Sequence, residues 1–170
     1  MTDGLPALAL ATDPIDPDVL ARPPARPEAA LADRARIGSI LLTGCLTAGV
    51  ALAVFAFELT YGHGLDAARD AAFSTLVFAE LLRAFGARSD TKLAGEVGWL
   101  SNPRLLAVVA VSFGLQIGIH HWAALRAVFG IDAVSPAECA AWIVLGCIPA
   151  AALEARKAWR RRRVGDLLSR

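Results

Sequence analysis

Twenty-one consecutive residues without a charged side chain, IGSILLTGCLTAGVALAVFAF, run from Ile37 to Phe57. A helix of about 20 apolar residues is long enough to cross the hydrocarbon core of a bilayer. Arg34 and Arg36 precede this segment and Glu58 follows it, so charged residues mark both of its ends. We therefore predict a transmembrane helix over this segment.

Three further apolar runs follow it. Residues 105–123 carry no charge other than two histidines at the far end, whereas residues 71–87 are interrupted by Glu80 and Arg83. The last run, 139–153, is short for a span and can be lengthened by its flanking residues, which reach the interface. The interrupted run is expected to be shielded from lipid by its neighbours. The sequence thus predicts an all-α membrane protein with four transmembrane helices in an antiparallel bundle, at about 37–58, 69–87, 104–123 and 137–156, plus a short N-terminal half-helix.

The composition agrees with a membrane protein. Hydrophobic residues make up 56% of the 170 residues, charged residues 19%, and the mean hydropathy is +0.51. The net charge of +1 does not by itself imply any partner, and no nucleic-acid partner is expected. Cys45, Cys139 and Cys147 lie within apolar runs without metal-ligand spacing, so we expect them to be small apolar residues.

The basic residues lie mainly in alternate loops. Fourteen of the 17 lie before the first predicted span, between the second and third, or after the fourth. The positive-inside rule then places these loops and the C-terminus in the cytoplasm. They are Arg22, Arg26, Arg34, Arg36, Arg88, Lys92, Arg104, Arg156, Lys157, Arg160, Arg161, Arg162, Arg163 and Arg170.

Two acidic residues are candidate cation ligands. Asp3 stands between Thr2 and a Gly-x-Pro helix break, where exposed carbonyl oxygens and a carboxylate together suit a cation; the alternative is a helix cap. Glu80 lies within a predicted span, where an acidic residue is by default a functional candidate. Its alternative is an ion pair with Arg83, three residues further along the helix.

Small residues at four-residue spacing can let helices approach closely. Gly44 with Ala48, and Gly114 with Gly118, form such pairs and are candidates for helix contacts.

The third predicted span contains three polar side chains near its end. His120 and His121 precede Trp122, and interfacial placement is favoured over metal binding. Gln116 is expected to hydrogen-bond across helices.

Several stretches, taken in order, resemble one family. The opening Thr2-Asp3-Gly4-Leu5-Pro6 is similar to the end of the sixth membrane helix in the calcium-pump branch of the P-type cation-transporting ATPases. Residues 72–85, followed by Arg88-Ser89, resemble the eighth helix of these pumps. Ser101-Asn102-Pro103 with residues 113–116 resembles the ninth, and residues 127–130 resemble the loop before the tenth.

The resemblance implies roles for particular residues. Thr2, Asp3 and Glu80 match positions that bind the transported cation, so Asp3 and Glu80 would be metal ligands of an incomplete site. Carboxylate oxygens suit calcium, manganese or magnesium. Arg83 stands where an asparagine is common in the family, and its positive charge can neutralise Glu80.

The resemblance also predicts a domain organisation and a function. Residues 1–12 would be the remnant of a broken membrane helix, 13–36 a cytoplasmic loop, 37–158 the four-helix membrane domain and 157–170 a basic cytoplasmic tail. The chain would contribute to the ion pathway and scaffold of a pump in the bacterial inner membrane.

The chain is not expected to be an enzyme alone, since it contains no Asp-Lys-Thr-Gly phosphorylation motif and no nucleotide or actuator domain. No cofactor is expected within it. Its expected partners are the lipid bilayer and the missing N-terminal part of a pump in trans. The alternatives are a small regulatory membrane protein and a non-functional gene remnant. Met1 stands where the family usually has valine, which suggests translation assigned from an internal GTG codon.

Overall fold

The computed structural model describes residues 4–13, 34–61, 63–89, 92–98 and 100–168, and every regular element in these ranges is a helix. The predicted all-α fold is therefore confirmed for the described residues. The helices are α1 (Gly4–Ala11), α3 (Arg34–Thr60), α4 (Leu65–Gly86), α5 (Ala94–Val97), α6 (Pro103–His121), α7 (Ala123–Phe129) and α8 (Pro136–Leu168).

Three of these helices are long and apolar enough to cross a membrane. The candidate spans are Ile37–Thr60 in α3, Pro103–His121 in α6 and Pro136–Arg162 in α8. Large apolar side chains project outward from all three, including Leu52, Val111 and Val144, which are each more than 60% exposed. Contiguous apolar surface of this kind needs an apolar surrounding. The chain is an integral membrane protein.

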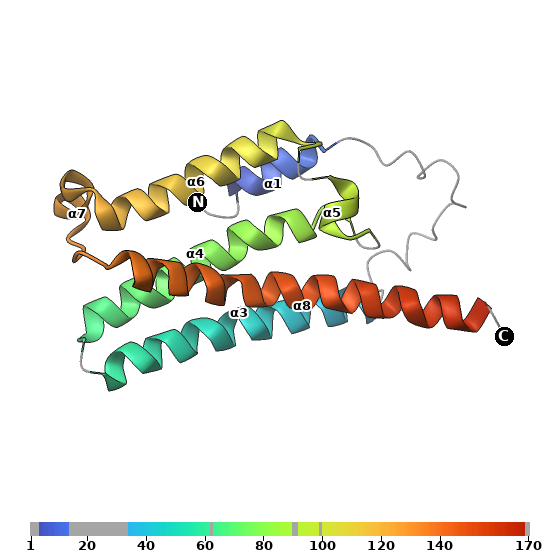
Figure 1. Ribbon diagram of the computed structural model, residues 1–170, viewed down its shortest axis with the longest axis horizontal. Helices are drawn as coiled ribbons and strands as arrows, with labels where there is room; N and C mark the ends of the chain where they lie inside the picture. The colour runs from blue at the N-terminus through green and yellow to red at the C-terminus, as the bar shows by residue number, and fades with distance from the viewer. Residues whose placement is uncertain (1–3, 14–33, 62, 90–91, 99, 169–170) are drawn as a thin grey trace.

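Helix α4 is the most enclosed element of the bundle. It packs against α3 and α8 on one side and against α6 and α1 on the other (Figure 1). Its Phe78 and Leu81 are completely buried. The expectation that neighbouring helices cover this weaker apolar run agrees with its many buried residues, although Glu80 and Arg83 themselves stay partly exposed.

Local sequence explains where the helices begin and end. Asn102 caps α6 by accepting a hydrogen bond from the backbone N–H of Leu105 at 2.9 Å, and Pro103 occupies the first helical position. Ser135 and Glu138 form a reciprocal capping box at the start of α8, with bonds of 2.8 and 3.2 Å. Gly130 ends α7 in the left-handed conformation, at φ +65°.

A close helix crossing lies at Gly146, where α8 meets α4. A Cβ atom on Gly146 would lie 3.0 Å from the backbone nitrogen of Ala79 and 3.1 Å from the Cβ of Phe78. Among the described residues, a Cβ at Gly44 or Gly114 meets no atom within 4 Å, so no helix contact forms at these two glycines within this part of the chain. Small-residue spacing alone does not show which helix face is in contact.

Helix α8 continues well beyond the fifteen-residue apolar run found in the sequence. Lys157 is buried and donates to the carbonyl oxygens of Gly86 and Lys92 at 2.6 and 3.3 Å and to Glu154 at 2.7 Å. The other carboxylate oxygen of Glu154 accepts from the backbone N–H of Ala94 at 2.8 Å. These bonds fix the basic half of α8 to the α4–α5 connection, and its last turns extend past the other helices (Figure 1).

Candidate functional site

Glu80 lies at the margin of the α4 face that packs against α1 and α6. Val77, Leu81 and Ala84 of α4 belong to one core cluster with Ala9 of α1 and with α6 residues. Glu80 follows Val77 by three positions and precedes Ala84 by four, so the three share a helix face. Phe73 and Leu76 precede Glu80 by seven and four positions and are 58% and 36% exposed, so Glu80 stands between the packed face of α4 and an exposed strip.

Glu80 is paired with Arg83 in this structure. Arg83 Nε donates to Glu80 Oε2 at 3.1 Å, and Arg83 Nη2 donates to the same oxygen. The Glu80 side chain is 23% exposed and the Arg83 side chain is 38% exposed. The ion pair considered from the sequence is thus present, and a cation binding at Glu80 would compete with the guanidinium.

The other two predicted ligands, Thr2 and Asp3, lie outside the described residues. Within the described part of the chain, no group of three or more His, Cys, Asp or Glu side chains is arranged to hold a metal ion. Glu80 is therefore the single predicted ligand whose surroundings are described.

A second polar cluster fixes the end of α1. Arg88, only 3% exposed, donates to both carboxylate oxygens of Asp13 at 2.8 to 3.2 Å. It also donates to the carbonyl oxygen of Gly98 and the hydroxyl of Ser101, both at 2.7 Å. Asn102 donates to Asp13 Oδ1 at 2.9 Å and to the carbonyl oxygen of Ala9 at 3.0 Å.

We call this cluster of Asp13, Arg88, Gly98, Ser101 and Asn102 the α1 clamp. It connects α1 to the end of α4 and the start of α6, so it fixes α1 against these two helices. Sequence reasoning missed it as a site, although Asn102-Pro103 before an apolar run is a recognisable helix start. Asp13 and Arg88 are 75 positions apart, so no local sequence pattern predicts that they pair.

The clamp should respond to acid. Burial raises the pKa of the Asp13 carboxyl, but hydrogen bonds from Arg88 and Asn102 and the charge of Arg88 outweigh burial, so the pKa lies below its usual value of 3.8. A lowered pKa in the folded state stabilises the fold above about pH 4, and the stabilisation is lost as the pH falls through the lowered value. We expect the unfolding midpoint in detergent to fall between pH 5 and pH 3, and to fall less steeply in Asp13→Asn. Equal pH slopes for the two proteins would contradict this.

A third polar cluster joins α4 to α6 inside the bundle. Gln116 donates to the hydroxyl of Ser74 at 2.9 Å, which confirms the predicted cross-helix hydrogen bond. His120 Nε2 lies 2.8 Å from the same hydroxyl, and its ring contacts Trp142 of α8 edge-on at 5.3 Å. His120 is 1% exposed and so lies inside the bundle, whereas His121 is exposed; the placement of both at the membrane interface stays a prediction. His120 is enclosed because it bonds across helices. The sequence alone does not show that His120 is buried while its neighbour His121 is exposed.

Comparison with known proteins places these features in a family. Residues 1–159 match the family model described as "Cation transporting ATPase, C-terminus". The chain is 32% identical over 134 residues to calcium-transporting ATPase type 2C member 2 of Mus musculus, covering 78% of the chain and 14% of that protein. It is 31% identical over 152 residues to a calcium-transporting ATPase of Bacillus subtilis, covering 88% of the chain and 17% of that protein.

A "probable cation-transporting ATPase F" of Mycobacterium tuberculosis is 30% identical over 136 residues, covering 80% of the chain and 15% of that protein. The chain thus spans only about one-sixth or less of the length of these relatives. It belongs to the cation-transporting P-type ATPases and corresponds to their C-terminal membrane domain.

Proposed function

We propose that this chain forms the C-terminal half of the transport domain of an ATP-driven pump for a divalent cation, calcium, manganese or magnesium. In this proposal α3, α4, α6 and α8 are four antiparallel spans and α1 is the end of a broken membrane helix. Thr2, Asp3 and Glu80 supply part of the ion site, and the remaining pump segments supply phosphorylation and the other ligands. The observation that carries the proposal is a carboxylate on the enclosed helix α4, next to Val77 and Ala84, which pack with Ala9 of α1 in one core cluster.

The charge distribution supports an orientation. The basic half of α8, the α5 connection and Arg88 all lie at one end of the bundle, opposite the α3–α4 turn (Figure 1). The positive-inside rule then favours a cytoplasmic C-terminus, and we propose the inner membrane of a bacterium as its location. The partner of α1 and α4 would be the N-terminal part of the pump.

The Glu80–Arg83 pair has a specific consequence under this proposal. The Arg83 guanidinium is bound to the carboxylate that a cation would need as a ligand. Breaking this ion pair costs free energy, and this cost lowers the apparent affinity for the cation. Hydrogen bonds to charged groups contribute about 1.5 kcal/mol or more, and about 1.4 kcal/mol corresponds to a tenfold change in affinity.

The test is a chimera in which this chain replaces the matching part of the Bacillus subtilis pump. We expect ATP-dependent uptake of radioactive calcium into inverted vesicles, with manganese and magnesium tested as competitors. Glu80→Gln should lower the apparent affinity about tenfold because a ligand is lost, and Arg83→Asn should raise it about tenfold because the competing cation is removed.

The matched control uses a second ion pair on the same helix at the same spacing. Arg69 and Asp66 lie 3.5 Å apart with side chains that are 64% and 96% exposed. Asp66→Asn and Arg69→Asn should leave the affinity unchanged. If Glu80→Gln and Arg83→Asn change uptake no more than these controls, Glu80 has only a structural role. A chimera that inserts and folds but takes up no cation would contradict the proposed function itself.

A further inference from the structure

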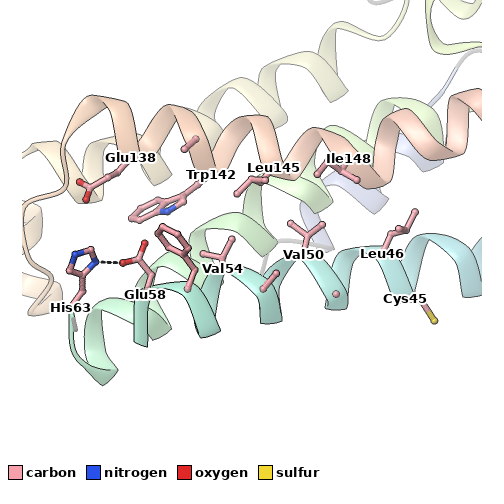
Figure 2. A pocket seen from close by; sticks show the side chains of 14 residues that line it. Cys45, Leu46, Val50, Val54, Glu58, His63, Glu138, Trp142, Leu145 and Ile148 are labelled. Atoms are coloured by element: carbon pink, nitrogen blue, oxygen red, sulfur yellow. Dashed lines mark hydrogen bonds and ion pairs between the residues drawn. The ribbon is translucent and has the colours of Figure 1, made fainter. Parts of the chain in front are cut away.

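An apolar groove runs along the junction of α3 and α8. It encloses about 630 Å³ and extends from Cys45 and Leu46 to Glu58 on α3. Figure 2 shows Val50, Val54 and Leu145 along its length, with Glu58, His63 and Glu138 gathered at one end. The groove is therefore amphipathic: its length is apolar, and its carboxylates lie at the end next to the α3–α4 turn.

The dimensions of the groove favour an alkyl chain over a helix. Thirteen residue steps from Cys45 to Glu58 rise about 20 Å. This is longer than one bilayer leaflet, about 15 Å of hydrocarbon, but shorter than the full core of about 30 Å. A volume of about 630 Å³ over about 20 Å gives a mean cross-section of about 30 Å². A helix about 10 Å across has a cross-section of about 80 Å², more than twice this value, so a single alkyl chain matches the groove more closely.

The polar end of the groove favours a cationic headgroup. Glu58 is 8% exposed and pairs with His63 at 2.5 Å, while Glu138 lies across the groove from them (Figure 2). A neighbouring hollow of about 180 Å³ shares these three residues and adds Asp70 and Asp132. Four carboxylates and one imidazole give this end a negative potential, which attracts a cation and repels an anionic lipid.

We propose that the α3–α8 groove is a binding site for a phospholipid with an ethanolamine headgroup. One acyl chain lies along Val50 and Leu145, and the primary ammonium donates hydrogen bonds to Glu138 and Glu58. A choline headgroup has no N–H to donate, and a glycerol headgroup carries no cation, so both should bind more weakly. This site is separate from Glu80, and the proposal does not depend on ion transport.

The test is native mass spectrometry of the full chain purified in detergent with equal amounts of phosphatidylethanolamine, phosphatidylcholine and phosphatidylglycerol of identical acyl chains. We expect ethanolamine lipid to be retained at least fivefold more than either competitor. Ala53 and Ala141 line the groove, and the double variant A53L/A141L should fill it and reduce retention at least fivefold. The matched control is A56L/A140L, on the same two helices at exposed positions that do not line the groove.

The headgroup contact has its own variant. Glu138→Gln keeps an oxygen that can cap α8 but removes the charge, and it should reduce the preference for ethanolamine lipid below twofold. Asp66→Asn, at a side chain that is 96% exposed, should not change it. Equal retention of the three lipids by the unmodified chain would overturn the headgroup assignment, and equal retention in A53L/A141L and its control would overturn the groove assignment.

A cross-linking experiment distinguishes a lipid from a protein occupant. A benzophenone attached to Cys45, which lines the groove, in a Cys147→Ser background should label lipid on illumination in native membranes. Labelling of a membrane protein instead of lipid would overturn the proposal.

Discussion

Replacing Arg88 with alanine should destabilise the fold by about 3–5 kcal/mol, the usual cost of removing one partner from a buried ion pair. Arg88 is 3% exposed and its guanidinium satisfies Asp13, Gly98 and Ser101 at once. Its removal leaves the Asp13 carboxylate, itself 18% exposed, without its cation. The free energy of unfolding in mixed SDS and dodecylmaltoside micelles, followed by circular dichroism, measures the effect.

Arg104 provides the matched control for this prediction. It is an exposed arginine in the first turn of α6, close in sequence to Asn102 of the α1 clamp. Arg104→Ala should change stability by no more than about 0.5 kcal/mol, as exposed substitutions usually do. Arg88→Lys should fall between the two, because one ammonium cannot reproduce the fork of a guanidinium. Equal losses in Arg88→Ala and Arg104→Ala would show that the clamp does not stabilise the bundle.

The second large effect is expected at Gly146. A Cβ there would lie 3.0 Å from the Ala79 backbone nitrogen and 3.3 Å from the Phe78 carbonyl carbon, and backbone atoms in a helix cannot move aside as a side-chain end can. Gly146→Ala should therefore cost about 1–3 kcal/mol as an overpacked contact. Gly146→Leu should cost more than about 4 kcal/mol, since α8 must separate from α4.

Gly114 is the comparison for this series. It lies in the middle of α6, where a Cβ meets no described atom within 4 Å. Gly114→Ala should be neutral or stabilising by up to about 1 kcal/mol, because alanine has the higher helix propensity. Unfolding in mixed micelles ranks the variants. If Gly146→Ala were as stable as Gly114→Ala, the α4–α8 crossing would not be limited by this contact.

The sequence determined the helical class and the family. Ile37–Phe57 and residues 105–123 could be predicted as spans because an uncharged run of that length has few other stable environments. The central position of α4 was also predictable, because a helix that carries Glu80 and Arg83 between two apolar spans must be covered by them. The ion pair of Glu80 with Arg83 and the cross-helix bond of Gln116 follow from residue type and helical spacing. The role of Glu80 as a cation ligand stays a prediction.

Only the tertiary structure decided which distant residues meet. The pairing of Asp13 with Arg88, the burial of His120 behind Trp142 and the close crossing at Gly146 each depend on how helices are rotated about their axes. A hydrophobic pattern that is apolar all round does not fix that rotation, so it does not single out Gly146, the glycine that meets α4. A span can be predicted from one segment, because it depends on the free energy of moving that segment's side chains into lipid. The α1 clamp and the α3–α8 groove depend on packing between segments that are far apart in the sequence.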